Sequence, residues 1–287
     1  MAKVWVLYNP KCSSGKGKTN AEKIESVLRG KDIEYIDVTT IDDMDAYISS
    51  LAVEDDVILC GGDGTLNYYI NHTTEETRKH KLGYYATGTG NDFLNDIGGK
   101  MGEVVEDISK YLQNLPVATI KGEKYLVLNG VGYGIDGYCC EVGDAERLKS
   151  DKPVNYTSIA IKGILFHFKP CTATVTADGR TAVYKHTWLV PAMNGRFYGG
   201  GMMATPNQDR LSKDRKVSLM VYHHPVNLIA LIVFPKIFKG EHIKKKKIVE
   251  IIEAKSATVA FDRPCALQVD GETILNVSEY SITVSED

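Results

Sequence analysis

Short apolar runs alternate with segments of helical periodicity along the first hundred or so residues. The apolar runs have the length of buried strands, and apolar residues at helical spacing lie between them. The predicted strands are residues 4–8, 33–38, 56–60 and 82–86, and the predicted helices are 19–28, 42–51 and a segment that starts at 66 and reaches 71. Alternating strands and helices predict parallel βαβ units, and so a doubly wound, mostly parallel α/β sheet with helices on both faces. Ligands bind such sheets at the carboxyl ends of the strands.

The pattern changes after about residue 120, where strand-like runs dominate. Turn signals such as Asp178-Gly179 and Asp270-Gly271 separate these runs and predict a β-rich second domain, a sandwich or a distorted barrel. The predicted strands are 125–129, 173–176, 181–190, 217–221, 256–261, 265–269 and 280–284. We expect the domain boundary near residues 115–122.

Composition excludes several classes of protein. With 287 residues, 43% of them hydrophobic and 25% charged, the chain can build the core of a soluble globular protein. A net charge of −3 argues against a general nucleic-acid binder. Six cysteines without a C-x-x-C pair predict reduced thiols rather than a disulfide framework. The N-terminus has no signal-peptide pattern, so we expect a cytoplasmic protein whose membrane contact is peripheral.

The strongest chemical signal is the loop Gly61-Gly62-Asp63-Gly64-Thr65, between a predicted strand and a predicted helix. Glycines let a backbone approach a phosphate closely, and the helix start that follows points free N–H groups at the same place. Thr65 and Asn67 can add side-chain donors, and Asp63 can meet a magnesium ion or a water bound to it. The alternative is a tight turn that Asp63 caps.

A second glycine loop, residues 87–93, follows the next predicted strand. Its Thr89 and Asn91 are candidate nucleotide contacts, and Asp92 is a candidate second acid near the metal or the acceptor. Because adjacent parallel strands end side by side, both loops can flank one site. Taken alone, the second loop is an N-capped helix start.

A third loop, residues 9–19, follows the first strand. Its Gly17-Lys18-Thr19 ending suggests a Walker A motif, but that motif needs a glycine where this chain has Cys12, so we reject it. A looser phosphate-contacting turn with Ser14, Gly15 and Lys16 remains, and a basic solvated loop is the alternative.

Together these loops resemble the diacylglycerol kinase catalytic family, within it most of all the soluble bacterial lipid kinases. The similarity continues through residues 129–136, 199–202, 205–207 and 268–272, and so covers nearly the whole chain in order. The first motif alone also occurs in NAD kinases, so an NAD kinase-like enzyme is an alternative. A catalytically weak nucleotide- or lipid-binding regulator is another.

The resemblance implies a lipid kinase that transfers the γ-phosphate of ATP, with magnesium, to the hydroxyl of diacylglycerol or a related lipid. It implies an ATP site in the cleft between a kinase domain (residues 1–120, which 276–287 could complete) and a lipid-binding domain (121–275). The general base would be Glu272, in a segment that otherwise reads as a hairpin turn, and Asp63 and Asp92 would assist. The implied and candidate nucleotide contacts are Asn9, Pro10, Ser14, Gly15, Thr40, Gly61, Gly62, Asp63, Gly64, Thr65, Leu66, Asn67, Tyr68, Thr89 and Asn91.

The resemblance also implies a structural magnesium site, with backbone carbonyls of Leu211 and Lys216 and the carboxylate of Asp214. Relatives commonly have glycine where this chain has Arg215. Losing that glycine could bar a positive φ, and two adjacent cations weaken the affinity for magnesium. The site therefore stays open.

An apolar segment at residues 226–238 precedes the lysine run 244–247. It is too short to span a bilayer and contains Pro235, but an apolar helix beside lysines suits docking on anionic lipid. The alternative is a buried helix followed by a solvated lysine run. The acceptor lipid and the oligomeric state, for which a homodimer is one option, are not readable from the sequence.

Overall fold

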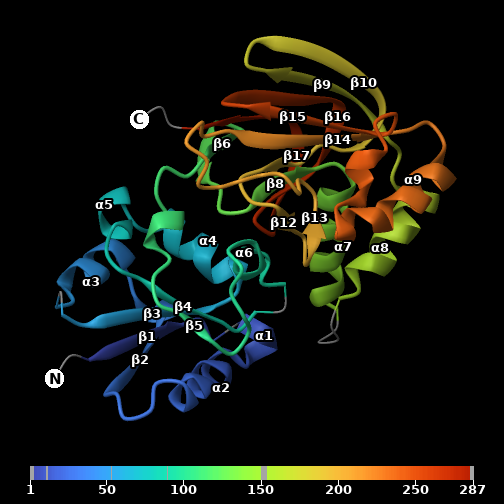
Figure 1. The fold of residues 1–287 in the computed structure, drawn as a ribbon. Coiled ribbons are helices and arrows are strands. Elements are labelled where there is room, and N and C mark those ends of the chain that lie inside the picture. Colours follow the sequence, from blue (N-terminus) through green and yellow to red (C-terminus); the bar gives the residue numbers. More distant parts are fainter. Residues whose placement is uncertain (1–2, 11, 53, 89, 150–153, 285–287) are drawn as a thin grey trace. The chain divides into compact units, whose positions relative to one another are not determined.

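The computed structural model describes residues 3–10, 12–52, 54–88, 90–149 and 154–284. The chain divides into two compact units, Met1–Asn114 and Leu115–Asp287 (Figure 1). The first is an α/β unit with a mostly parallel sheet and the second is rich in β-strands. The predicted fold class is therefore confirmed.

The first unit contains a five-stranded sheet in the order β2-β1-β3-β4-β5. Its strands are β1 (Val4–Tyr8), β2 (Ile33–Asp37), β3 (Asp56–Gly61), β4 (Gly83–Ala86) and β5 (Val104–Val105). The first four run parallel, and β5 is antiparallel to β4. Tyr8 lies level with Asp37 and with Cys60, so the parallel strands end along one edge of the sheet.

Helices cover both faces of this sheet (Figure 1). They are α1 (Cys12–Gly15), α2 (Gly17–Ala21), α3 (Met44–Ser50), α4 (Asp63–Asn71), α5 (Glu75–Arg78) and α6 (Asp92–Asp96), with 3-10 turns at Glu22–Ser26, Val38–Thr40 and Ser109–Tyr111. Ala21 and Ile24 pack with Val4, Val6 and Tyr8 on one face, as the alternation along β1 requires. The helix expected from residue 66 begins at Asp63, because the extended Gly62 is its N-cap.

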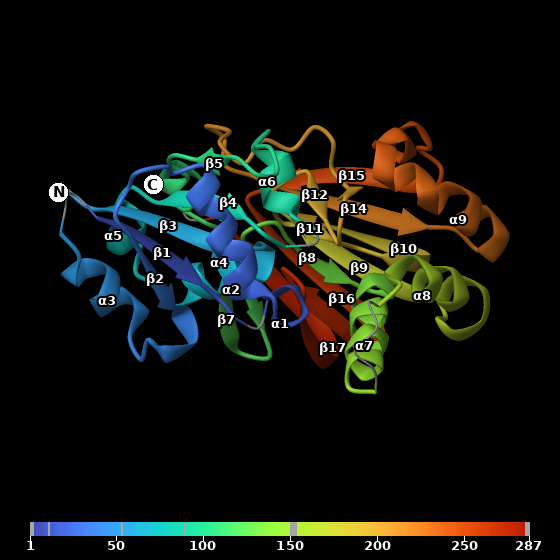
Figure 2. The same ribbon diagram turned by 90° about the horizontal axis from the view of Figure 1, so that it is seen from below.

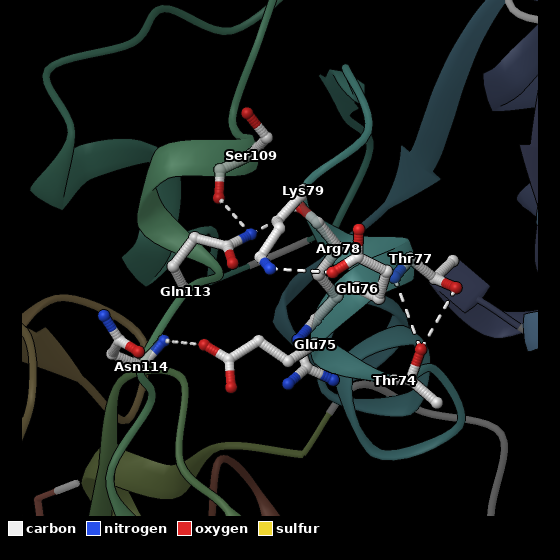
Figure 3. Close-up of polar contacts among 9 residues, drawn as sticks. All are labelled: Thr74, Glu75, Glu76, Thr77, Arg78, Lys79, Ser109, Gln113 and Asn114. Carbon is white, nitrogen blue, oxygen red and sulfur yellow. Dashed lines mark hydrogen bonds and ion pairs between the residues drawn. The ribbon is translucent and has the colours of Figure 1, made fainter. Parts of the chain in front are cut away.

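A buried arginine holds the far end of α4 in place. Arg78 donates hydrogen bonds to the carbonyl oxygens of Ile70, at 3.0 Å, and Leu112, at 3.1 Å, and also to that of Thr73. Gln113 in turn donates to the Arg78 carbonyl at 2.6 Å (Figure 3). These bonds satisfy backbone acceptors at the end of α4 and tie them to the 3-10 turn near the end of the unit.

The second unit contains a ten-stranded antiparallel sheet in the order β7-β6-β17-β16-β8-β11-β14-β10-β9, with β15 beside β14. Because β9 also pairs with β16, six of these strands close into a ring, a distorted barrel. The strands are β6 (Val117–Ile120), β7 (Glu123–Leu126), β8 (Gly130–Tyr133), β9 (Cys171–Ala177), β10 (Arg180–Leu189), β11 (Ala192–Met193), β14 (Val217–His223), β15 (Val249–Ala254), β16 (Ser256–Val269) and β17 (Glu272–Thr283). A separate hairpin joins β12 (Phe197–Tyr198) to β13 (Met202–Met203).

Several strand predictions in this unit need correction. The strand expected at 125–129 is β7, which ends at Leu126, and the strands expected at 256–261 and 265–269 are one strand, β16, with an irregular register between Ala260 and Cys265. Residues 276–283 belong to β17, which pairs with β6 and β16 in this second sheet. The sequence pattern missed β15 and the helices α7 (Ile135–Arg147) and α8 (Tyr156–Lys162).

The apolar segment 226–238 forms α9 (Asn227–Val233) and a 3-10 turn, Phe234–Lys239, that begins where Pro235 interrupts the helix. Together with α7, α8 and a π-helical turn at Gly163–His167, it lies beside the sheet (Figures 1 and 2). Among the described residues, no helix is both long enough and apolar enough to cross a membrane.

Candidate functional site

The predicted nucleotide residues of the first unit follow the carboxyl ends of its parallel strands. Asn9 and Pro10 follow β1, Thr40 follows β2, and the two glycine loops follow β3 and β4. The structure therefore brings the loops to one edge of one sheet. Thr89 and the side chain of Ser14 lie outside the described residues.

The two glycine loops touch backbone to backbone. A Cβ on Gly62 would lie 2.9 Å from the Gly88 Cα, and a Cβ on Gly88 would lie 2.6 Å from the Gly62 Cα. Real Cβ atoms do not approach other atoms this closely, so both positions require glycine. The Thr87 amide also donates to the Gly61 carbonyl at 2.8 Å. The loops after β3 and β4 thus form one continuous backbone surface beside the start of α4.

Asp63 holds the two loops together. Its two carboxylate oxygens accept the backbone N–H groups of Asp92, at 2.9 Å, and Phe93, at 2.8 Å. These amides open α6, so Asp63 caps that helix from a position 29 residues earlier in the chain. The carboxylate therefore has a clear positioning role. Its contact with magnesium stays a prediction.

Asn91 and Asp92 are both buried at the start of α6. Asn91 adopts a left-handed conformation with φ 48°, which asparagine tolerates better than most residues. Its Nδ2 donates to the Gly88 carbonyl at 2.7 Å, while its Oδ1 has no hydrogen-bond partner among the described residues. A buried acceptor without a partner is costly and can be satisfied by a ligand or a water. Asn91 is the predicted contact that this geometry supports best.

The loop after β1 packs against the start of α4. Cys12 Sγ lies 3.1 Å from Thr65 Oγ1, and a Cβ on Gly17 would lie only 1.9 Å from the Asn9 carbonyl oxygen. Asn9 itself accepts the Cys12 amide at 3.1 Å. Cys12, the residue that excludes a Walker A loop, is thus a packing contact of the Thr65 side chain.

Several predicted contacts in α4 and after β2 can serve only in part. The side chains of Thr65 and Leu66 are buried, and their backbone amides already donate to the Gly62 carbonyl at 3.0 and 3.2 Å. Tyr68 is stacked on His72, with ring centroids 3.9 Å apart, and Gly64 is exposed. Thr40 is exposed, and its hydroxyl donates to the Asp37 carbonyl at 2.8 Å.

The predicted base Glu272 lies in the second unit, as the first residue of β17 after a two-residue hairpin loop. Asp270 and Gly271 have φ values of 48° and 99°, as in a type I′ turn. The Asp270 carboxylate accepts three backbone N–H groups, those of Leu128 and Asn129 at 2.7 Å and that of Gly130 at 3.0 Å. This clamp fixes the hairpin and leaves Glu272 exposed.

Helix α7 lies beside Glu272. Thr273 donates to Asp144 Oδ2 at 2.7 Å, which ties the start of β17 to the helix. Burial, followed by the charges of Asp136, Asp144 and Glu272, raises the pKa of Cys140 to about 12, so this thiol stays protonated near Glu272.

Asp136, at the start of α7, is the polar residue to which sequence reasoning assigned no role. It is buried, its Oδ1 accepts the Gly137 amide at 3.0 Å, and the buried side chains of Tyr198 and Gln268 lie beside its carboxyl group. Burial raises the pKa of Asp136 to about 6. A Cβ on Gly132 would lie 1.7 Å from Asp136 Oδ2, so the glycine makes room for the acid. The sequence pointed to Asp136 only through its position at the end of the segment 129–136, which resembles the family.

The loop at residues 211–216 fits a magnesium ion poorly. Arg215 does adopt a left-handed conformation, with φ 42°, so losing the glycine did not bar that backbone geometry. The Asp214 carboxylate, however, faces the ammonium of Lys216, with Oδ2 4.0 Å from Nζ. The Lys216 carbonyl already accepts a bond from Gln208 at 2.8 Å. These residues therefore do not fit a magnesium ion.

Comparisons with known proteins identify the family of the two successive domains. Residues 3–120 match the diacylglycerol kinase catalytic domain, and residues 129–283 match the YegS C-terminal NAD kinase beta sandwich-like domain. A diacylglycerol kinase of Mycobacterium tuberculosis is 24% identical over 273 residues, 92% of this chain and 86% of that protein. One of Staphylococcus aureus is 24% identical over 286 residues, 93% and 85% of the two chains.

Two crystal structures from Bacillus anthracis str. Sterne share the fold at 20% identity, with TM-scores of 0.69 and 0.61. They cover 99% of this chain and 92% and 94% of theirs, and the second is named a diacylglycerol kinase. Because the two domain models follow each other along nearly the whole sequence, the chain belongs to the diacylglycerol kinase-like family of lipid kinases.

Proposed function

We propose that the protein is an ATP- and magnesium-dependent kinase that phosphorylates the hydroxyl of diacylglycerol or a related lipid. The observation that carries the proposal is the contact of Gly62 with Gly88 beside the start of α4. This packing fixes the two loops beside the helix start, where the exposed Gly64 leaves the backbone open to a phosphate chain, and the N-terminal end of α4 favours negative charge.

The residues of the first unit bind and orient the nucleotide in this proposal. Backbone groups of residues 62–64 bind phosphate, and Asn91 offers its Oδ1, which has no partner among the described residues, to the nucleotide or its water shell. Asp63 keeps the second loop in register by capping α6. Magnesium, when bound with ATP, neutralises phosphate charge, and Asp63 and Asp92 are the acids of this unit that would lie near it.

The second unit supplies the acceptor side of the reaction. We assign Glu272 as the general base, because it is an exposed carboxylate on a hairpin that three backbone bonds to Asp270 hold rigid. It takes the proton of the lipid hydroxyl as that oxygen forms a bond to the γ-phosphorus, and the bond to ADP breaks. Rigid placement of the carboxylate matters because proton transfer requires hydrogen-bond reach.

The test is a panel of acceptors with radiolabelled ATP. Diacylglycerol, monoacylglycerol, phosphatidylglycerol, sphingosine and NAD are each incubated with the full-length protein, and the labelled product is separated. We expect label in one or more of the lipids and none in NAD. Label in NAD alone would assign an NAD kinase, and ATP binding without any labelled product would indicate a regulator; either result would overturn the proposal.

A further inference from the structure

The second unit exposes apolar side chains on two neighbouring helical segments. Phe166, in the π-helical turn, is 76% exposed, and Leu228 and Ile232, on α9, are 60% and 59% exposed. We call the following six residues the apolar patch: Ile161, Leu165, Phe166, Leu228, Ile229 and Ile232. Large apolar residues scattered singly on a surface need no explanation, but several on adjoining elements do.

A hydrogen bond joins the two segments. The Asn227 side chain, in the first turn of α9, donates to the Ile164 carbonyl of the π-helical turn at 3.1 Å. Figures 1 and 2 show α8 and α9 together at one end of the second unit. The opposite face of α9 is buried through Ala230 and Val233, so core packing does not require the exposed face to be apolar.

Phe166 lies in a π-helical turn, Gly163–His167. Gly163 and Ile164 are buried in this turn, and Leu165 and Phe166 are exposed. Such turns interrupt regular α-helices and occur often at functional sites.

The charged side chains within the two segments that carry the apolar patch have one sign. Residues 155–170 contain Lys162 and Lys169, residues 224–240 contain Lys236 and Lys239, and neither segment contains an Asp or Glu. The whole chain has a net charge of −3, so this concentration of cations is local. An apolar surface bordered by lysines matches an anionic bilayer, whose interface accepts apolar side chains and attracts positive charge.

We propose that the apolar patch and its four flanking lysines dock the protein on an anionic lipid bilayer. Phe166, Leu228 and Ile232 insert at the level of the headgroups, while the lysine ammonium groups stay among the lipid phosphates. The proposal adds to the proposed function a way of reaching a substrate in a membrane. Docking itself needs neither ATP nor catalysis, so it can be tested without them.

The experiment measures cosedimentation of the full-length protein with phosphatidylglycerol vesicles and with phosphatidylcholine vesicles, without ATP. We expect strong binding to the first and weak binding to the second. The double variant Phe166→Ser/Ile232→Ser should lower the partition coefficient about tenfold or more, because burial of apolar area drives insertion. Lys162→Gln/Lys239→Gln should lower it most at low salt, since salt screens surface charge.

Matched controls separate docking from general stickiness and from misfolding. Val183 is 62% exposed on β10, outside the apolar patch, so Val183→Ser should leave vesicle binding unchanged. Lys245→Gln/Lys246→Gln tests the lysine run on its own. Because the substituted residues are exposed, the thermal unfolding of all variants should match that of wild type.

Vesicle binding that Phe166→Ser/Ile232→Ser leaves intact would overturn the proposal. It would also be overturned if the wild type formed a dimer that this variant dissociates and did not bind vesicles, because the apolar patch would then be an interface between two copies. Loss of vesicle binding with no phosphorylation of any lipid would support docking and reject the proposed function, so the two can fail separately.

Discussion

Replacement of Asp63 by Ala separates two roles that this acid could have. In the structure, each of its carboxylate oxygens accepts one backbone N–H group, from Asp92 at 2.9 Å and from Phe93 at 2.8 Å. Asp63→Ala removes both acceptors and leaves two amides at the start of α6 without partners. We therefore expect the second glycine loop to lose its fixed position beside the first.

The size of the effect follows from the two bonds. A hydrogen bond to a charged group contributes about 1.5–3 kcal/mol, so losing two costs the local structure around α6 about 3–6 kcal/mol. Asp63→Asn retains one carbonyl oxygen and should cost roughly half as much. Since about 1.4 kcal/mol is a factor of ten, hydrogen exchange of the Asp92 and Phe93 amides should accelerate by about 100-fold or more in Asp63→Ala.

The assay combines hydrogen exchange at these two amides with ATP binding, each with and without magnesium. A positioning role predicts fast exchange and weakened ATP binding under both conditions. The matched control is Asp178→Ala, which likewise removes a carboxylate that accepts two backbone amides, those of Lys255 at 3.0 Å and Ser256 at 2.9 Å, but in the other unit. The reasoning is refuted if exchange at Asp92 and Phe93 stays at the wild-type rate, or if ATP binding weakens only when magnesium is present.

Three further predictions concern stability. The folded-state pKa of Asp136, about 6, lies above the ordinary 3.8, so the folded protein loses stability as pH rises between these values. In urea unfolding, the free energy of unfolding of Asp136→Asn should match that of wild type at pH 4 and exceed it by about 3 kcal/mol at pH 8. Equal stabilities at pH 8 would contradict this. Arg78→Met leaves three carbonyls without their donor and should lower the free energy of unfolding by about 3 kcal/mol, whereas Lys79→Met, beside it and exposed, should scarcely change it. Arg215→Gly relieves a left-handed conformation and should raise the free energy of unfolding by about 1 kcal/mol. Magnesium should shift the melting temperature of this variant no more than that of wild type. A larger shift would indicate that the loop binds magnesium.

Sequence patterns located β1, β3 and β4 because these strands are largely buried, whereas the helix expected at 19–28 is α2 and the 3-10 turn Glu22–Ser26. The pattern placed the start of α4 at residue 66, three residues too late, because the loop glycines carry no hydrophobic signal. The helix begins at Asp63, with Gly62 as its N-cap. In the second unit, the Asp270-Gly271 turn was readable because a type I′ turn needs two positive φ values. The sequence did not predict that β16 continues through Pro264, because a proline usually marks the end of a strand. The strand continues there with an irregular register.

The candidate site was predictable in its loops and less so in its interactions. The glycines in the two loops are consistent with the close approach of residues 62 and 88. The hydrogen bonds of Asp63 to two amides of the next loop are visible only in the structure. The buried state of Asp136 depends on Tyr198 and Gly132, which are distant in sequence or too small to give a pattern. Phe166 lies in a π-helical turn, which a pattern with the α-helical period of 3.6 residues does not predict.

The most direct test of the proposed chemistry is the rate at which Glu272→Gln phosphorylates its best lipid acceptor, measured together with its ATP affinity. If the carboxylate takes the proton of the hydroxyl, the rate should fall by about 100-fold or more, a barrier increase of roughly 3 kcal/mol, while the dissociation constant for ATP stays at the wild-type value. A variant that phosphorylates lipid as fast as the wild type would contradict the assignment of Glu272 and the mechanism built on it.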